Sequence, residues 1–174
     1  MPGSVFLAGE NVELRTIEEE DYEKLRDWVN HYDVRRFIGI DQPTNLKQET
    51  EFVESELEKQ STTLVGICVD GELIGDIALE EKENGTAELG ILIGPEYHGN
   101  GYGTEASRLL INHAFEQLRY HKIKTRVVES NQKSARVWEK LGFEQEGTLR
   151  EHVFLDGEYR DMKLFGLIED EWNE

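Results

Sequence analysis

The sequence HGNGYGTEA, residues 98–106, decides the fold, because three glycines alternate there between two regular patterns. Residues 87–93 before it form an apolar strand pattern, and residues 106–118 after it repeat apolar side chains with the helical period. Glycines let backbone N–H groups turn toward a ligand without obstruction by Cβ, and the first turn of a helix adds unpaired donors and the positive end of its dipole. The stretch predicts a phosphate-binding loop between a strand and a helix.

Two common phosphate loops do not fit this stretch. A dinucleotide-binding turn needs G-x-G-x-x-G, but the sixth position counted from Gly99 is Thr104. A nucleotide P-loop needs a lysine, and the stretch contains none. The loop instead resembles the acetyl-CoA pyrophosphate loop of the GNAT superfamily of N-acetyltransferases, Arg/Gln-x-x-Gly-x-Gly/Ala. It runs His98-x-x-Gly101-x-Gly103, with histidine in place of arginine or glutamine.

A second block strengthens the resemblance. Residues 131–143, NQKSARVWEKLGF, are similar to the superfamily's second element, in the expected order and at roughly the expected spacing. Residues 9–15, GENVELR, and residues 146–172 resemble the branch that acetylates the N-termini of ribosomal proteins. The resemblance therefore covers nearly the whole chain, and only residues 33–62 carry no readable motif.

The resemblance implies a single N-acetyltransferase domain over residues 1–174, of the α/β (α+β) class. Its mixed, mostly antiparallel sheet would have roughly seven strands, flanked by about four helices. Local patterns agree with this class: they predict strands over residues 12–16, 63–69, 73–80, 87–93 and 123–129, helices over 18–30, 45–60 and 132–141, and hairpin turns at 70–71, 84–85 and 156–157. In the second helix, capped by Asn45, we expect Phe52, Val53 and Leu57 to face inward.

The resemblance further implies direct transfer of an acetyl group from the CoA thioester to a primary amine. Glu88 is the candidate base, because relatives often carry a glutamate on this strand that deprotonates the amine through water. Strand alternation puts Glu88, Gly90 and Leu92 on one face. The alternative is a glutamate at the strand edge that only faces water.

The leaving thiolate needs a proton donor. Many relatives use a tyrosine where this chain has Trp138, and an indole N–H does not give up a proton at working pH. Ser134 is therefore the candidate, as in the ribosomal branch, and the alternative is a solvent-facing residue in the first turn of a helix. Where part of that branch has a glutamate, this chain has Val153.

The resemblance assigns acetyl-CoA as the co-substrate and predicts no metal, since the histidines lack ligand spacing. The residues expected to bind acetyl-CoA are Ile91, Leu92, Ile93, His98, Gly99, Asn100, Gly101, Tyr102, Gly103, Thr104, Asn131, Lys133 and Arg136. Asn131 could equally serve only as a helix N-cap.

The net charge of the chain limits the classes of partner that it can bind. The chain has 37 acidic and 19 basic residues and a net charge of −18, which disfavours nucleic acid and anionic membranes. The acidity fits either a high-salt cytoplasm or a cationic substrate. Residues 119–140 hold seven lysines and arginines against Glu129 and Glu139, a local +5 that leaves −23 elsewhere. We expect this window to bind the CoA phosphates, with a solvated face as the alternative.

No stretch suggests a membrane span or a signal peptide, so the sequence predicts a cytoplasmic protein, and a homodimer is compatible with it. The single cysteine, Cys68, lies in an apolar run and is expected to be buried rather than nucleophilic. Three functions remain open: acetylation of a protein N-terminus, acetylation of a polyamine or aminoglycoside, and acyl-CoA sensing without turnover.

Overall fold

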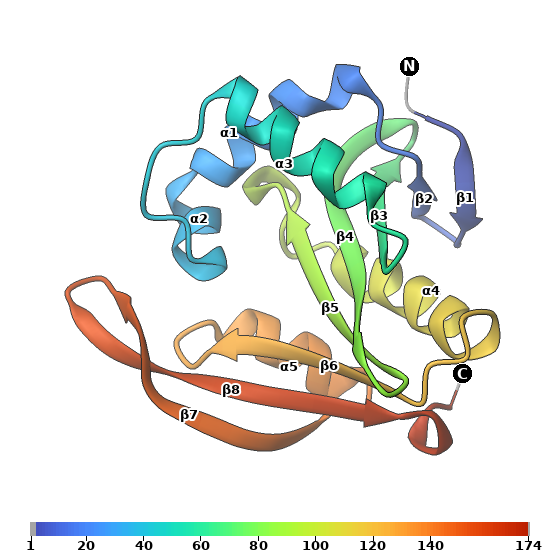
Figure 1. Ribbon diagram of the computed structural model, residues 1–174, viewed down its shortest axis with the longest axis vertical. Helices are drawn as coiled ribbons and strands as arrows, with labels where there is room; N and C mark the ends of the chain where they lie inside the picture. The colour runs from blue at the N-terminus through green and yellow to red at the C-terminus, as the bar shows by residue number, and fades with distance from the viewer. Residues whose placement is uncertain (1–2, 174) are drawn as a thin grey trace.

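The structure, a computed structural model, describes residues 3–173 as one eight-stranded sheet with helices on both faces (Figure 1). The strands are β1 (Val5–Ala8), β2 (Glu13–Arg15), β3 (Thr62–Val69), β4 (Glu72–Glu83), β5 (Thr86–Ile93), β6 (Lys122–Val128), β7 (Glu144–Leu155) and β8 (Glu158–Ile168). The helices are α1 (Tyr22–Asn30), α2 (Tyr32–Ile38), α3 (Leu46–Glu58), α4 (Tyr102–Glu116) and α5 (Gln132–Lys140), with single 3-10 turns at Glu19–Asp21, Pro95–Tyr97 and Glu169–Glu171.

The strands lie in the order β1-β2-β3-β4-β5-β6-β8-β7, and only the β5–β6 pair is parallel. Three of the antiparallel connections are the tight turns predicted from sequence. Their first residues, Asp70, Asn84 and Asp156, have φ near +50°, and the glycine after each also has positive φ. Two successive positive φ angles define the turn whose twist matches a hairpin, which explains the Asp-Gly and Asn-Gly pairs. The mixed, mostly antiparallel sheet predicted from the sequence is confirmed.

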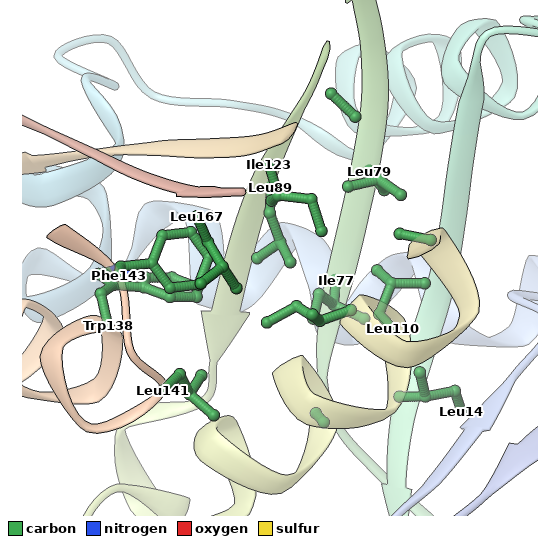
Figure 2. Close-up of a cluster of buried hydrophobic side chains, with 14 of the residues drawn as sticks. Leu14, Ile77, Leu79, Leu89, Leu110, Ile123, Trp138, Leu141, Phe143 and Leu167 are labelled. Carbon is green, nitrogen blue, oxygen red and sulfur yellow. The ribbon is translucent and has the colours of Figure 1, made fainter. Parts of the chain in front are cut away.

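Two apolar clusters lie on opposite faces of the sheet. The larger one packs α4 and α5 against residues such as Leu89 and Ile123, and Figure 2 shows Trp138, Leu141 and Phe143 beside Leu167. The smaller one packs α1, α2 and α3 against the other face, where Leu92 is buried. We call these the α4–α5 face and the α1–α3 face. Cys68 belongs to the second cluster, and its burial raises the pKa of the thiol to about 11, as expected for a cysteine that is no nucleophile.

Two elements and one helix orientation differ from the sequence prediction. Strand β1 and helix α2 were not predicted, and they account for the eighth strand and the fifth helix. In α3, the Asn45 cap is confirmed, because its side chain accepts a hydrogen bond from the Gln48 backbone N–H at 3.0 Å. Val53 is buried as predicted, but the inward placement of Phe52 and Leu57 was wrong, since they are 58% and 41% exposed. The helix turns its Glu49–Val53 stripe toward the protein instead.

Among residues 3–173, no helix has both the length and the apolar character needed to cross a membrane.

Candidate active site

The parallel strands β5 and β6 form a fork. They pair at only three positions, from Thr86 with Lys122 to Glu88 with Lys124. Beyond Glu88 the described residues give the β6-facing edge of β5 no further strand partner, although the Thr125 hydroxyl donates to the Leu89 carbonyl at 2.9 Å. An unpaired strand edge can bind an extended ligand that carries amide groups. The predicted ligand residues Ile91, Leu92 and Ile93 all lie along this edge.

The glycine loop follows β5 at the open end of the fork. Gly99 and Gly101 have φ of 83° and 81°, and a Cβ at either position would meet no atom within 4 Å. Helix α4 begins after Gly101, which has no side chain to cap it. The first backbone N–H groups of α4, those of Tyr102 and Gly103, therefore have no acceptor within the helix. The predicted role of this loop in binding phosphate stays a prediction.

Two polar side chains shape the loop from within. The Nε2 atom of His98 lies 2.8 Å from the Ile93 carbonyl oxygen, so the ring donates from this nitrogen. The Asn100 side chain donates to the Tyr97 carbonyl at 3.0 Å. The loop is thus held to the end of β5 by its own residues, and this contact gives a physical reason for the histidine at position 98.

A cavity of about 350 Å³ lies beside the loop. Gly101 and Thr104 contribute to its lining, together with the cations Arg108 and Lys140. The acids in the lining include Glu105, whose carboxylate accepts hydrogen bonds from backbone N–H groups of the neighbouring β1–β2 turn. Lys140 adds a cation to the predicted ligand residues, and the sequence motif did not single it out.

Helix α5 starts at the same open end, directly after β6. Asn131 caps it, accepting a hydrogen bond from the Ser134 backbone N–H at 3.3 Å. Trp138 is only 2% exposed and packs on Phe143, while its indole Nε1–H donates to the Ser134 hydroxyl oxygen at 3.1 Å. The indole occupies one acceptor site of this oxygen, and within residues 3–173 no hydrogen bond uses the hydroxyl hydrogen of Ser134. Lys133 and Arg136 are exposed on the outer side of the helix.

The basic window of residues 119–140 does not form one surface, which corrects the expectation from sequence. The cations of β6 alternate with the buried Ile123 and Val127, so they point to the α1–α3 face. The cations of α5 lie on the opposite side of the sheet. Of the cations of α5, Lys140 lines the cavity beside the glycine loop.

Glu88 lies where the fork opens. Its carboxylate accepts a hydrogen bond from Arg126 Nε at 2.9 Å, and its side chain is 20% exposed. The predicted alternation is confirmed, because Leu92 belongs to the α1–α3 cluster and Leu89 to the other. Between Glu88 and Leu92, Gly90 is exposed in the middle of the sheet, and a Cβ there would meet nothing within 4 Å.

Two further acids lie on this face, and sequence reasoning missed both. Glu49 of α3 is 5% exposed, and burial raises the pKa of its carboxyl. Asp76 of β4 lies opposite Leu92, and desolvation, with a contribution from the charge of Glu49, raises the pKa of its carboxyl to about 7. A single acid within the apolar run LIGDIAL, residues 73–79, was the available signal.

The tip of the β7–β8 hairpin reaches α2 on the same side of the molecule. Asp156 accepts a hydrogen bond from the Tyr32 hydroxyl, and it forms an ion pair with Arg36 Nη2 at 2.9 Å. These contacts join two segments that are far apart in the sequence. They bracket the α1–α3 face near the open end of the fork.

The pattern of the family described as "Acetyltransferase (GNAT) domain" matches residues 11–144. The chain belongs to the GNAT acetyltransferase family. A GNAT relative, "Putative ribosomal N-acetyltransferase YdaF" of Bacillus subtilis, is 29% identical over 172 residues, covering 94% of both chains. "Spermidine N(1)-acetyltransferase" of Escherichia coli strain K12 is 30% identical over 153 residues, covering 87% of this chain and 82% of the relative. This GNAT chain is accordingly an enzyme, an N-acetyltransferase.

A solved structure extends the likeness to the fold. "Crystal structure of spermidine N-acetyltransferase from Vibrio cholerae in complex with CoA and spermine" matches with a TM-score of 0.87 at 23% identity, covering 94% of this chain and 98% of that one. At this identity the likeness concerns the fold alone. The α/β class and the GNAT architecture predicted from sequence are confirmed.

Proposed function

We propose that this N-acetyltransferase uses acetyl-CoA and delivers the acetyl group to the N-terminal amine of a protein. The observation that carries the proposal is the β5–β6 fork. Because β5 and β6 are parallel, the loops that follow them meet at one end of the sheet. That end brings together the unpaired edge of β5, the uncapped start of α4 at Gly101, and the hydroxyl of Ser134.

The residues present fit acetyl-CoA. The space around Gly99 and Gly101 admits a pyrophosphate close to backbone N–H groups, and Cβ atoms there would narrow it. The cations of α5, with Lys140 in the neighbouring cavity, supply charge for further phosphates. The free edge of β5 supplies N–H and C=O groups for the pantetheine amides. Acetyl-CoA would supply the activated acyl group, and the protein would hold and orient it.

Three groups of the chain would act on the reaction. Backbone N–H groups near Leu92 and Ile93 would stabilise the negative charge on the thioester oxygen. Ser134, held by the indole of Trp138, would donate its free hydroxyl hydrogen toward the leaving sulfur. Glu88 has one oxygen on Arg126, and its second oxygen would accept a hydrogen bond from the incoming amine.

A protein acceptor is favoured by exposed apolar side chains near the acceptor side. Phe154 and Tyr159 at the β7–β8 tip are each 66% exposed and contact one another, and Tyr32 of α2 is 48% exposed. Such side chains suit a polypeptide that extends away from the reacting amine. YdaF, whose name describes it as a putative ribosomal acetyltransferase, supports the same acceptor class.

A polyamine is the second candidate, and a different observation favours it. Glu49 and Asp76 are carboxylates on the α1–α3 face without an ion-pair partner in residues 3–173, and a polycation would match them. The spermidine acetyltransferase relative is consistent with this. The non-catalytic sensor is disfavoured, because the relatives are named as acetyltransferases and Ser134 is in place.

A thiol-release assay tests the proposal. The purified chain would be mixed with acetyl-CoA and with peptides starting in serine or alanine, spermidine or an aminoglycoside. We expect CoA release with the peptides and little with the same peptides blocked at their N-termini. CoA release with spermidine and with none of the peptides would show that a polyamine, the second candidate, is the acceptor. Release with none of these amines would overturn the proposed function.

A further inference from the structure

The centre of the sheet is open to solvent on the α1–α3 face. Ala78 of β4 pairs with Gly90 of β5, and neither has a side chain beyond Cβ. Gly90 is exposed and Ala78 is partly exposed, although both lie in interior strands. We call the solvent-exposed space above these two residues the Gly90 opening. An amine that approaches the β5 edge from this face would pass over it.

Asp76 and Glu49 lie beside the Gly90 opening. Asp76 is two residues before Ala78 on the same face of β4, so it stands diagonally across from Gly90, at a Cα separation of about 7–8 Å for such a pair. Glu49 comes from α3 above and is close enough for its charge to act on Asp76. Within residues 3–173, neither carboxylate has a hydrogen bond or an ion pair.

Glu49 is buried and Asp76 is partly buried, and within residues 3–173 neither carboxylate has a partner. A buried acid without a partner loses hydration and gains nothing in return, and most proteins pair or replace it. A second acid nearby adds repulsion between like charges. The arrangement is compensated if a cation enters the Gly90 opening, or if one carboxylate takes up a proton. Both conditions are met by an acceptor that arrives as an ammonium ion.

We propose, on the basis of the proposed acetyl transfer, that Asp76 takes the proton from the acceptor's ammonium group and that Glu49 positions and tunes Asp76 for this step. The N–H bond of R–NH₃⁺ breaks, its electron pair stays on nitrogen, and the proton forms an O–H bond on the Asp76 carboxylate. The neutral amine then forms the N–C bond at the thioester carbon, and the C–S bond breaks. The second amine proton goes to the leaving sulfur by way of Ser134, and Asp76 returns its proton to water.

Glu88 is less suited to receive this proton, although it lies on the same side of Gly90. Its carboxylate already accepts a hydrogen bond from Arg126 Nε at 2.9 Å, so one of its two oxygens is occupied. Among the described residues Asp76 has no such partner, and desolvation together with the charge of Glu49 raises the pKa of its carboxyl to about 7. A base is most effective when its pKa lies near the working pH.

The surroundings of Asp76 carry little other charge. Glu49 of α3 is the one charged group whose field acts on it among the described residues. In the adjoining strands its neighbours are Leu92 of β5 and Gly66 of β3, which do not titrate. A substitution of Glu49 should therefore shift the pKa of the Asp76 carboxyl, while Asp76 remains the group that titrates.

The experiment measures kcat against pH, from pH 5.5 to 9, with a serine-starting hexapeptide and with spermidine as the acceptor probes. In the unaltered protein we expect kcat to rise through about pH 7. Asp76→Asn should lower kcat by roughly 10²-fold and abolish this rise. Glu49→Gln should keep the high-pH rate and move the rise to lower pH, because it removes a negative charge beside Asp76. Glu54→Gln, on the exposed side of the same helix, is the matched control and should change neither quantity.

A different result is expected if Glu88, and not Asp76, takes the proton. If the rise near pH 7 persists in Asp76→Asn and disappears in Glu88→Gln, the proposal is wrong and Glu88 is the base. If Asp76→Asn does not fold, a rise that stays in place in Glu49→Gln also overturns the proposal. A failure of the proposed function looks different, because no variant and no acceptor would then release CoA.

Discussion

The two faces of the sheet are built on different principles. On the α4–α5 face, side chains such as Leu110, Ile111 and Ala114 are completely buried in one large apolar cluster. On the α1–α3 face, a smaller cluster adjoins two carboxylates without ion-pair partners among residues 3–173, and the sheet is exposed at Gly90. The first face carries the helices that begin at the loops proposed to bind acetyl-CoA. The second face is the one an amine acceptor is proposed to approach.

This difference indicates which face of the sheet stabilises the folded protein and which face destabilises it. Close packing on the α4–α5 face stabilises the protein and fixes the helix starts at Gly101 and Asn131. On the other face, Asp76 and Glu49 have no ion-pair partner among residues 3–173, and desolvation makes their charged forms oppose folding. Proteins commonly retain such destabilising groups at functional sites, where activity depends on them. The two faces should therefore respond differently to substitution.

The largest expected effect is on the chemical step. Ser134→Ala removes the proposed donor to the leaving sulfur and should lower kcat by about 10²-fold or more, with little change in the Kd for acetyl-CoA. A steady-state assay of thiol release measures kcat, and calorimetric titration measures the Kd for acetyl-CoA. Ser130→Ala, at the exposed residue before the cap, is the control and should leave both unchanged. Full activity in Ser134→Ala would show that water protonates the thiolate.

A smaller effect is expected on the cofactor side. Gly101→Val forces a branched side chain into a backbone with φ of 81° and places it over the helix start. The Kd for acetyl-CoA should increase by at least tenfold, because phosphate could no longer reach the N–H groups. Gly71→Val is the matched control, with φ of 79° in open space at the β3–β4 turn. It should cost comparable stability and leave the Kd alone, and equal Kd values in the two variants would refute the cradle.

On the acceptor side, Asp76→Asn should stabilise the protein at high pH. The folded state keeps the Asp76 proton up to about pH 7, whereas the unfolded state loses it near pH 4, so stability falls as pH rises through this window. Removing the charge should raise Tm at pH 8 by roughly 4–8 °C, for a gain on the order of 2 kcal/mol, and by little at pH 4.

Thermal melts of both proteins at pH 4, 6 and 8 check this. The quantity to compare is the difference in Tm between the two proteins at each pH. Other groups also make stability depend on pH: hydrogen bonds from Tyr97 and Lys24 lower the pKa of Glu72, so its contribution to stability increases as pH rises. A variant that is less stable at pH 8 would mean that Asp76 has a partner in solution.

The smallest effect is expected from salt. A net charge of −18 should destabilise the folded chain at low ionic strength, and counterions within a Debye length of about 10 Å at 0.1 M should relieve the repulsion. Tm should rise by a few degrees from low to molar potassium chloride, while the KM for acetyl-CoA increases. A flat or falling Tm would favour the alternative in which the acidity serves a cationic acceptor.

The loop and helix starts of the proposed cofactor side could be predicted from sequence because their signals are local. Glycine spacing, the Asn131 cap and the Asp-Gly turns depend on a few adjacent residues, and tertiary contacts only confirm them. The split of the basic window could also have been found, since Lys122, Lys124 and Arg126 occupy every second position, which puts them on one face of a strand.

The residues of the proposed acceptor side could not be predicted in the same way. Glu49 and Asp76 are 27 positions apart in the sequence, and only the packing of α3 on the sheet brings them together. The orientation of α3 depends on that packing too, which is why Phe52 and Leu57 are exposed while Val53 is buried. Helix α2 has seven residues and no period long enough to stand out.

The central claim is that one face of the sheet binds acetyl-CoA and the other handles the amine. The most direct test measures, side by side, the Kd for acetyl-CoA and the kcat at saturating acetyl-CoA in Gly101→Val and Asp76→Asn. We expect Gly101→Val to raise the Kd at least tenfold with kcat largely retained, and Asp76→Asn to lower kcat about 10²-fold with the Kd retained. Two variants that change both quantities in the same proportion would contradict this division of the molecule.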